Sequence, residues 1–117
     1  NYAIKGSDFT IIKSVELLTQ HMITNNKPLG AICIAPVMIA KVLQNMGRSG
    51  KLTGGFDEKI SSDIESMGVS IDKVNAKSIV VDYKNKIVST PAYVEAKSIK
   101  EVNEGIIKLV NQLLKMI

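Results

Sequence analysis

The chain has 117 residues and a mass of 12.7 kDa, which is a common size for one domain. Hydrophobic residues make up 45% and charged residues 22%, a globular balance that excludes disorder as the default. Its apolar runs are shorter than the roughly 18 residues that a membrane span needs, so no membrane is expected as a partner. One cysteine and one histidine exclude an internal disulfide framework and leave too few ligands for a zinc cage.

The net charge of +4 does not indicate a nucleic-acid surface. Every cation except Arg48 is a lysine, and the lysines are scattered singly along the chain. Surfaces that bind phosphate backbones usually cluster their cations and favour arginine. Tryptophan is absent and aromatic residues make up 4%, which also argues against base stacking. We therefore expect the lysines to form solvated surface.

The first part of the chain reads as helix, strand, helix. Four apolar residues at helical spacing predict the first amphipathic helix: Ile11, Val15, Leu18 and Met22. Ser7 or Asp8 is predicted to cap its start, and Asn25-Asn26 with Pro28 to end it. Residues 29–33 lack polar alternation, which predicts a strand buried on both faces of a parallel sheet. Residues 36–46 return to helical spacing, with Gly47 as the stop.

The second part reads as short strand, helix, hairpin, helix. Residues 51–55 predict a short strand, and Asp57 opens a helix that buries Ile60, Ile64 and Met67. Residues 78–82 and 87–90 predict the two strands of a hairpin, with Asn85 in a left-handed conformation between them. The buried side of the last helix is predicted to be Ile99, Val102, Ile106, Val110 and Leu113.

This order of elements predicts an α/β fold. Only two candidate parallel strands, residues 29–33 and 51–55, are available to four helices. So small a parallel sheet could not cover its own edges or both of its faces. We therefore expect further strands upstream of Asn1 and interpret residues 1–117 as the carboxyl-terminal half of a domain.

Cys33 lies where the buried strand runs directly into a helix. A nucleophile elbow needs small residues two positions on either side of the nucleophile, and Ala31 and Ala35 meet that need. Pro36 suits the first helical turn, whose dipole would favour a thiolate, and the Ile34 N–H would point toward a developing oxyanion. A cysteine between two isoleucines is also typical of an inert buried side chain. From the residues alone, both interpretations stay open.

Three blocks of sequence carry a family resemblance: Lys27-Pro28-Leu29-Gly30, Cys33-Ile34-Ala35-Pro36 and Asn85-Lys86-Ile87-Val88-Ser89-Thr90-Pro91-Ala92-Tyr93. They closely resemble the ElbB-like proteins, glyoxalase-like members of the PfpI and class I glutamine amidotransferase-like superfamily that are often assigned to isoprenoid biosynthesis. The resemblance implies a flavodoxin-like three-layer sandwich with a parallel sheet, a β-hairpin before the last helix, and Cys33 at the elbow. It also implies that a glutamate partner and a Gly-rich oxyanion loop precede Asn1.

The sequence departs from the superfamily pattern at two positions. Many members place a histidine directly after the cysteine or at the end of the next strand. Here Ile34 and Phe56-Asp57 occupy those positions. The departure argues against a full triad and against hydrolytic amidotransferase or protease chemistry.

Five residues besides Cys33 are candidates for the oxyanion site or pocket: Ile34, Gly55, Asp57, Thr90 and Pro91. Asp57 follows the second strand and is also a natural N-cap, and the two roles are compatible. Thr90 and Pro91 belong to the loop that borders the cysteine pocket in the family. His21 is placed by its helical position on a surface flank, and Tyr93 is expected to pack with a polar tip.

Two functions follow from these features. The first is a cofactor-independent, glyoxalase-like enzyme whose cysteine thiolate attacks small dicarbonyls such as glyoxal. The second is a non-catalytic redox-sensing or metabolite-binding scaffold of the same fold. Neither cofactor nor metal is expected, the expected partner is a small molecule, and a homodimer is left open. A reduced thiol suits the cytoplasm, with the mitochondrial matrix as the alternative.

Overall fold

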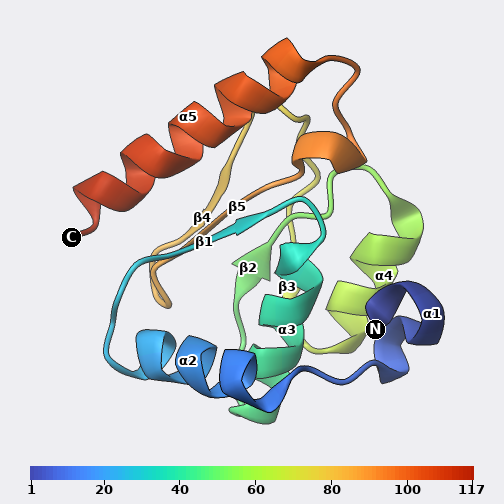
Figure 1. Cartoon of the computed structure of the whole chain (residues 1–117), viewed down its shortest axis with the longest axis vertical. Coiled ribbons are helices and arrows are strands. Elements are labelled where there is room, and N and C mark those ends of the chain that lie inside the picture. Colours follow the sequence, from blue (N-terminus) through green and yellow to red (C-terminus); the bar gives the residue numbers. More distant parts are fainter.

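Helices lie on both sides of a short central sheet (Figure 1). The structure is a computed structural model that describes all 117 residues. Its helices are α1 (Tyr2–Lys5), α2 (Lys13–Thr24), α3 (Ala35–Asn45), α4 (Glu58–Ser66) and α5 (Ile99–Lys115), with two 3-10 turns, η1 (Gly6–Asp8) and η2 (Ala92–Val94). Its strands are β1 (Leu29–Ile32), β2 (Lys51–Leu52), β3 (Ser70–Ile71), β4 (Val80–Asp82) and β5 (Ile87–Thr90). None of the helices combines the length and the apolar character needed to cross a membrane.

The central sheet has the strand order β1-β5-β4. β5 pairs with β1 in parallel, with Leu29 opposite Ile87 and Ile32 opposite Thr90. It also pairs with β4 in antiparallel fashion, which confirms the predicted hairpin. The parallel partner of β1 is thus the second hairpin strand. β2 instead pairs in parallel with the short β3, which the sequence did not predict.

The layers agree with the predicted sandwich. α5 covers one face of the sheet, and α2, α3 and α4 lie on the other side (Figure 1). Gly30 on β1 allows the close approach of α5, because a Cβ there would meet Leu113 and Leu109 at 2.9 and 3.0 Å. The α/β fold and its layered arrangement are therefore as predicted.

α3 and α4 bury the faces that their sequences predict. In α3, the side chains of Val37, Ala40 and Leu43 are buried in the main core. In α4, Ile64 is buried, and Met67 is buried at the end of the helix. Both helices lie between other elements, so their apolar stripes have neighbours to pack against.

α2 differs from the prediction at its start and on its apolar stripe. It begins at Lys13, and its N-cap residue Ile12 makes no side-chain capping bond. Ser7 and Asp8 lie in η1, so the predicted cap is wrong. The buried residues of the helix are Thr19 and Ile23, whereas Val15 and Leu18 of the predicted stripe are 40% and 64% exposed. Ile11 precedes the helix and, like Met22, is half-buried.

The buried face of α5 is also shifted. Val102 is buried as predicted, whereas Ile99 and Val110 are 76% and 45% exposed, so those two assignments are wrong. The other buried residues of α5 are Gly105 and Leu109. A Cβ at residue 105 would overlap the Ala76 carbonyl oxygen, so glycine sets how closely α5 approaches the loop before β4.

The hairpin turn places its left-handed residue one position later than predicted. Lys86 has φ 56°, and Asn85 is not among the residues with positive φ. Asn85 is buried, and its side-chain amide donates to the Ser49 carbonyl at 2.9 Å and to Asp82 at 2.8 Å. The Lys51 N–H donates to the same Asp82 carboxylate at 3.0 Å. These hydrogen bonds hold the Asn85 side chain in place, and Lys86 adopts the left-handed conformation instead.

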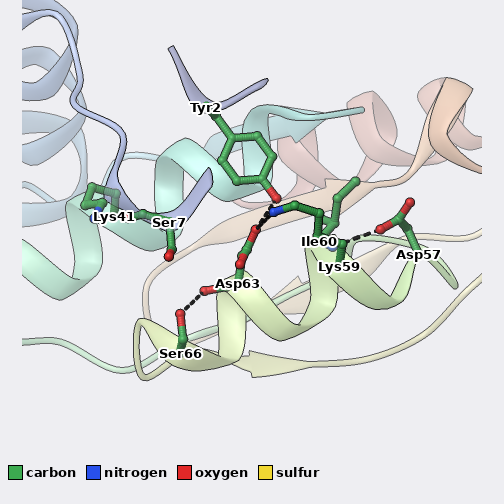
Figure 2. A network of polar contacts seen from close by, with 8 residues as sticks. All are labelled: Tyr2, Ser7, Lys41, Asp57, Lys59, Ile60, Asp63 and Ser66. Carbon is green, nitrogen blue, oxygen red and sulfur yellow. Dashed lines mark hydrogen bonds and ion pairs between the residues drawn. The ribbon is translucent and has the colours of Figure 1, made fainter. Parts of the chain in front are cut away.

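The first residues of the chain are fastened to α4 (Figure 2). The Tyr2 hydroxyl donates to Asp63 Oδ2 at 2.6 Å, and Lys59 Nζ donates to the same oxygen at 2.7 Å. These hydrogen bonds, led by the one from Lys59, lower the pKa of Asp63. Burial, followed by the contact with Asp63, raises the pKa of Tyr2. The chain start is thereby held on the α3–α4 side of the molecule.

Candidate active site

Cys33 occupies a sharp turn between β1 and α3. Its backbone has φ 64°, in the left-handed region that non-glycine residues rarely adopt. A sharp, strained turn of this kind between a strand and a helix is also the backbone arrangement found in nucleophile elbows. The residue is a free cysteine, and its side chain is half-buried.

The turn leads straight into the amino end of α3. Ile34 is the N-cap residue of that helix, and its carbonyl accepts the Val37 N–H at 3.1 Å. Pro36 lies in the first turn, where a missing N–H costs no hydrogen bond. The Ile34 N–H has no backbone acceptor within the chain. Cys33 therefore lies beside the positive end of a three-turn helix, next to a free N–H group.

The end of β5 lies next to Cys33. The Cys33 N–H donates to the Thr90 carbonyl at 3.0 Å, which places the end of β5 against the elbow. The Thr90 side chain points elsewhere, because its hydroxyl is buried and donates to the Ser78 carbonyl at 2.8 Å. Pro91 then ends β5, and Ala92 opens η2 with φ 46°. Thr90 thus borders Cys33 through its backbone.

A carboxylate that the sequence did not single out joins two loops at this end of the sheet. Glu95 Oε1 accepts the Phe56 N–H at 2.6 Å. Gly55 has φ 66°, and a Cβ there would overlap Glu95. Glu95 follows η2 directly, so its hydrogen bond links the loop after β5 to the loop after β2. No local pattern could have found it, since its partner lies 39 residues away.

Asp57 has the structural role that its position allows. Its carboxylate accepts the Ile60 N–H at 2.8 Å and so caps α4. The N-cap interpretation is therefore confirmed. The side chain is exposed, and its capping bond holds one oxygen on α4.

The two further candidates for chemistry, His21 and Tyr93, lie on the surface. His21 is exposed on α2, where its ring is 3.3 Å from the Asn25 amide, so the predicted surface position is confirmed. Tyr93 is also exposed. No group of three or more His, Cys, Asp or Glu side chains is arranged to hold a metal ion. The turn therefore places a free thiol next to the unpaired Ile34 N–H group, while His21 and Tyr93 lie on the surface.

An apolar groove of about 270 Å³ begins beside the elbow. Ile34 and Met38 line its α3 side, while Ile12 and Val15 line the side formed by α2 and the segment before it. Phe9 closes the groove from the start of the chain. Cys33 itself lines none of the cavities of the chain. The groove therefore reaches the residues that directly follow Cys33, Ile34 and Ala35, and does not include Cys33 itself.

Known proteins resemble this chain over almost its whole length. It is 31% identical over 124 residues to the Homo sapiens "glutamine amidotransferase-like class 1 domain-containing protein 3, mitochondrial". It is 29% identical to the Rattus norvegicus "ES1 protein homolog, mitochondrial". Each alignment covers 98% of the chain and 45% of the relative. No family model matches.

A solved structure shows the same arrangement of elements. The crystal structure of an isoprenoid biosynthesis protein with an amidotransferase-like domain from Ehrlichia chaffeensis superposes with a TM-score of 0.84 at 22% identity. The superposition covers 99% of this chain and 52% of that protein. The chain has an amidotransferase-like fold. It spans about half the length of the proteins that it matches.

Proposed function

We propose that Cys33 is the nucleophile of a cofactor-independent, glyoxalase-like enzyme that acts on small dicarbonyls such as glyoxal. The observation that carries the proposal is the left-handed backbone of Cys33 between β1 and α3. Such a conformation costs roughly 1–3 kcal/mol and persists where the surrounding structure enforces it. Strain of this kind at a free, half-buried cysteine supports a chemical role over a packing role.

The proposed reaction uses the groups around the elbow in sequence. The Cys33 thiolate adds to one aldehyde carbon and forms a hemithioacetal. The Ile34 N–H and the positive end of α3 stabilise the oxyanion that develops. A carboxylate outside these 117 residues moves a proton between the two carbons through an enediol, which leaves a 2-hydroxyacyl thioester. Water then cleaves the carbon–sulfur bond, releases the 2-hydroxy acid and restores the thiol.

The test is glycolate formation from glyoxal by the protein that carries this chain. Cys33→Ala should abolish turnover, because no other thiol is present among these residues. Replacing the exposed Tyr93 with Phe serves as the matched control and should leave the rate within about twofold. Unchanged turnover in the Cys33→Ala variant would remove the basis of the proposal.

The second candidate is a redox-sensing or metabolite-binding role for the same cysteine. It is favoured by the lack of a histidine beside Cys33, because the one histidine of the chain, His21, is exposed on α2. Alkylation of Cys33 against pH distinguishes the two. A midpoint near the ordinary thiol value of about 8.5 argues against both roles, while a reactive thiol without glyoxal turnover favours the sensor.

The compartment belongs to the same proposal. The names of the human and rat relatives place those proteins in mitochondria. This supports the mitochondrial matrix, the alternative to a cytoplasmic location. Either compartment keeps a free thiol reduced, as the proposed chemistry requires.

A further inference from the structure

Cations that are scattered along the sequence gather at one end of the central sheet. β1 and β5 run in parallel, so Lys27 and Lys86, which precede these strands, lie at the same end. Lys51 opens β2 at this end, because its N–H donates to the carboxylate of Asp82, the last residue of β4. Lys84 lies in the hairpin turn between β4 and β5. Positive charge is therefore concentrated at the end of the sheet opposite to the elbow.

Two hollows adjoin the hairpin turn at this end. The first lobe has a volume of about 370 Å³ and is lined by Gly47, Arg48, Ser49, Lys84 and Asn85. The second lobe, of about 320 Å³, shares three of these residues and extends along Tyr83. Each volume lies within the range of about 300–1,000 Å³ that is usual for small-molecule sites. We call the two lobes together the hairpin cleft.

Buried polar groups line the cleft and hold its shape. Asn85 is 2% exposed, and its side-chain amide donates to the Ser49 carbonyl and to Asp82. The Asp82 carboxylate also accepts the backbone N–H groups of Asn85 and Lys51, each at 3.0 Å. Three N–H donors thus stabilise the negative charge of this buried carboxylate. The cleft is therefore preformed, and the one carboxylate that lines it already has its partners.

The first lobe contains two cations that are free to bind a ligand. They are Arg48, the one arginine of the chain, and Lys84, and no carboxylate lines this lobe. The ion pairs of the chain are made by other cations, namely Lys51, Lys59 and Lys73. A guanidinium group matches the oxygens of a phosphate with two parallel N–H donors, and an ammonium group adds a second charge. Two positive charges correspond to the roughly two negative charges of a phosphate monoester at pH 7.

We propose that the hairpin cleft binds a small phosphate monoester, with the phosphate between Arg48 and Lys84 and the organic part along Tyr83. The Tyr83 side chain lines the second lobe and is 73% exposed, so its ring offers apolar surface to a ligand. A nucleic-acid backbone carries one charge per phosphate and is bound by rows of cations, whereas these two cations share one lobe. The cleft and the elbow lie at opposite ends of β5, so this inference does not depend on the proposed function.

The test titrates phenyl phosphate into the protein that carries this chain, at constant ionic strength. The amide NMR signals of Ser49, Lys84 and Asn85 should shift together and give a Kd of about 1 mM. Dimethyl phosphate is a diester with one negative charge, so it should bind at least about tenfold more weakly. Equal binding of the diester, or unshifted signals at about 20 mM phenyl phosphate, would overturn the proposal.

Substitutions assign the binding to the cleft. Arg48→Gln and Lys84→Gln should each weaken phenyl phosphate binding about tenfold, because each removes a charge-assisted contact. The matched control, Lys100→Gln, removes the same charge from an exposed position in the first turn of α5 and should change the Kd less than about twofold. Tyr83→Ala should weaken phenyl phosphate about threefold and leave the Kd of inorganic phosphate unchanged.

Two outcomes of these measurements would contradict the proposal. A loss in Lys100→Gln equal to that in Arg48→Gln would mean that the net charge of the protein attracts the anion. An RNA oligonucleotide or anionic lipid vesicles that shift the same signals and are not displaced by phenyl phosphate would assign the cleft to a macromolecular partner instead.

Discussion

The backbone of Cys33 sets the side chain's direction before any chemistry begins. A left-handed residue turns the chain sharply, so the thiol leaves the end of β1 beside the first turn of α3. Glycine would adopt this conformation without strain, and alanine would not. The backbone conformation of Cys33 is therefore energetically unfavourable, and it fixes the direction of the turn into α3.

Two substitutions at Cys33 separate backbone strain from packing. Both Cys33→Gly and Cys33→Ala remove the thiol, but only glycine relieves the left-handed strain. We expect the glycine variant to be more stable than the alanine variant by about 1 kcal/mol in urea unfolding. The control is Ala31→Gly on β1, where φ is not positive and a destabilisation of about 1 kcal/mol is expected. An alanine variant as stable as the glycine variant would show that residue 33 is not strained.

Glycines in this chain are required for two different reasons, which two alanine substitutions distinguish. At Gly105 a Cβ would overlap the Ala76 carbonyl, so Gly105→Ala should destabilise by about 2 kcal/mol despite the better helix propensity of alanine. Gly68 has φ 83° and open space around it, so Gly68→Ala should cost about 1 kcal/mol through strain alone. Only the first change should alter the hydrogen exchange of α5. Equal exchange of α5 in both variants would contradict the role given to Gly105.

At the scale of elements, an apolar stripe predicts the buried face of a helix only where other elements of the chain pack against that face. The stripes of α3 and α4 identified their buried faces because both helices pack inside the chain. The stripe of α2 and the Val110 side of α5 are equally apolar, yet they are exposed here. An amphipathic pattern shows which face of a helix is apolar, but it does not show which part of the protein buries that face. β3 was not predicted, because its two residues are too few to show an alternating pattern and, unlike β2, they do not belong to a longer run that suggests a strand.

The candidate site was predictable where it depends on local sequence. Small residues around Cys33 and a helix predicted over residues 36–46 were sufficient to place the turn between β1 and α3, which begins at Ala35. The contact between Glu95 and Phe56 was not predictable, because nothing local marks a loop glutamate. Asn85 shows a related limit, since its distant contact with Ser49 decides which turn residue becomes left-handed.

The attachment of α1 to α4 should depend on pH. The pKa of Asp63 is lowered in the folded state by Lys59 and Tyr2. Its contribution to stability is therefore present above the unfolded value of about 3.9 and is lost as the pH falls through the lower folded value. We expect Asp63→Asn to lower the free energy of unfolding by about 1 kcal/mol at pH 7 and to have little effect near pH 2.

Thermal unfolding at the two pH values measures this difference. The matched control is Asp72→Asn, because the pair of Asp72 with Lys51 is exposed and 3.8 Å long. That change should stay within about 0.5 kcal/mol at both pH values. An Asp63→Asn penalty of equal size at pH 7 and pH 2 would show that the carboxylate charge is not responsible.

At the scale of the whole molecule, the burial pattern predicts two levels of local stability. α3 buries six residues, among them Val42 and Leu43, whereas α2 buries only Thr19 and Ile23. Opening α2 exposes little apolar surface, so it should cost less free energy than global unfolding. Native-state hydrogen exchange in rising urea should show α2 amides opening locally with a small dependence on urea, while α3 amides follow global unfolding.

A pair of truncations checks that prediction independently. Leu43→Ala creates a cavity in the shared core, so it should lower the opening free energy of α3 by about 2–5 kcal/mol and reduce global stability equally. Leu18→Ala removes an exposed side chain and should leave α3 unchanged. α2 and α3 amides with one common urea dependence would mean that the chain unfolds as a single cooperative unit. Loss of exchange protection confined to α2 in mild urea would instead identify α2 as the weakest part of the molecule.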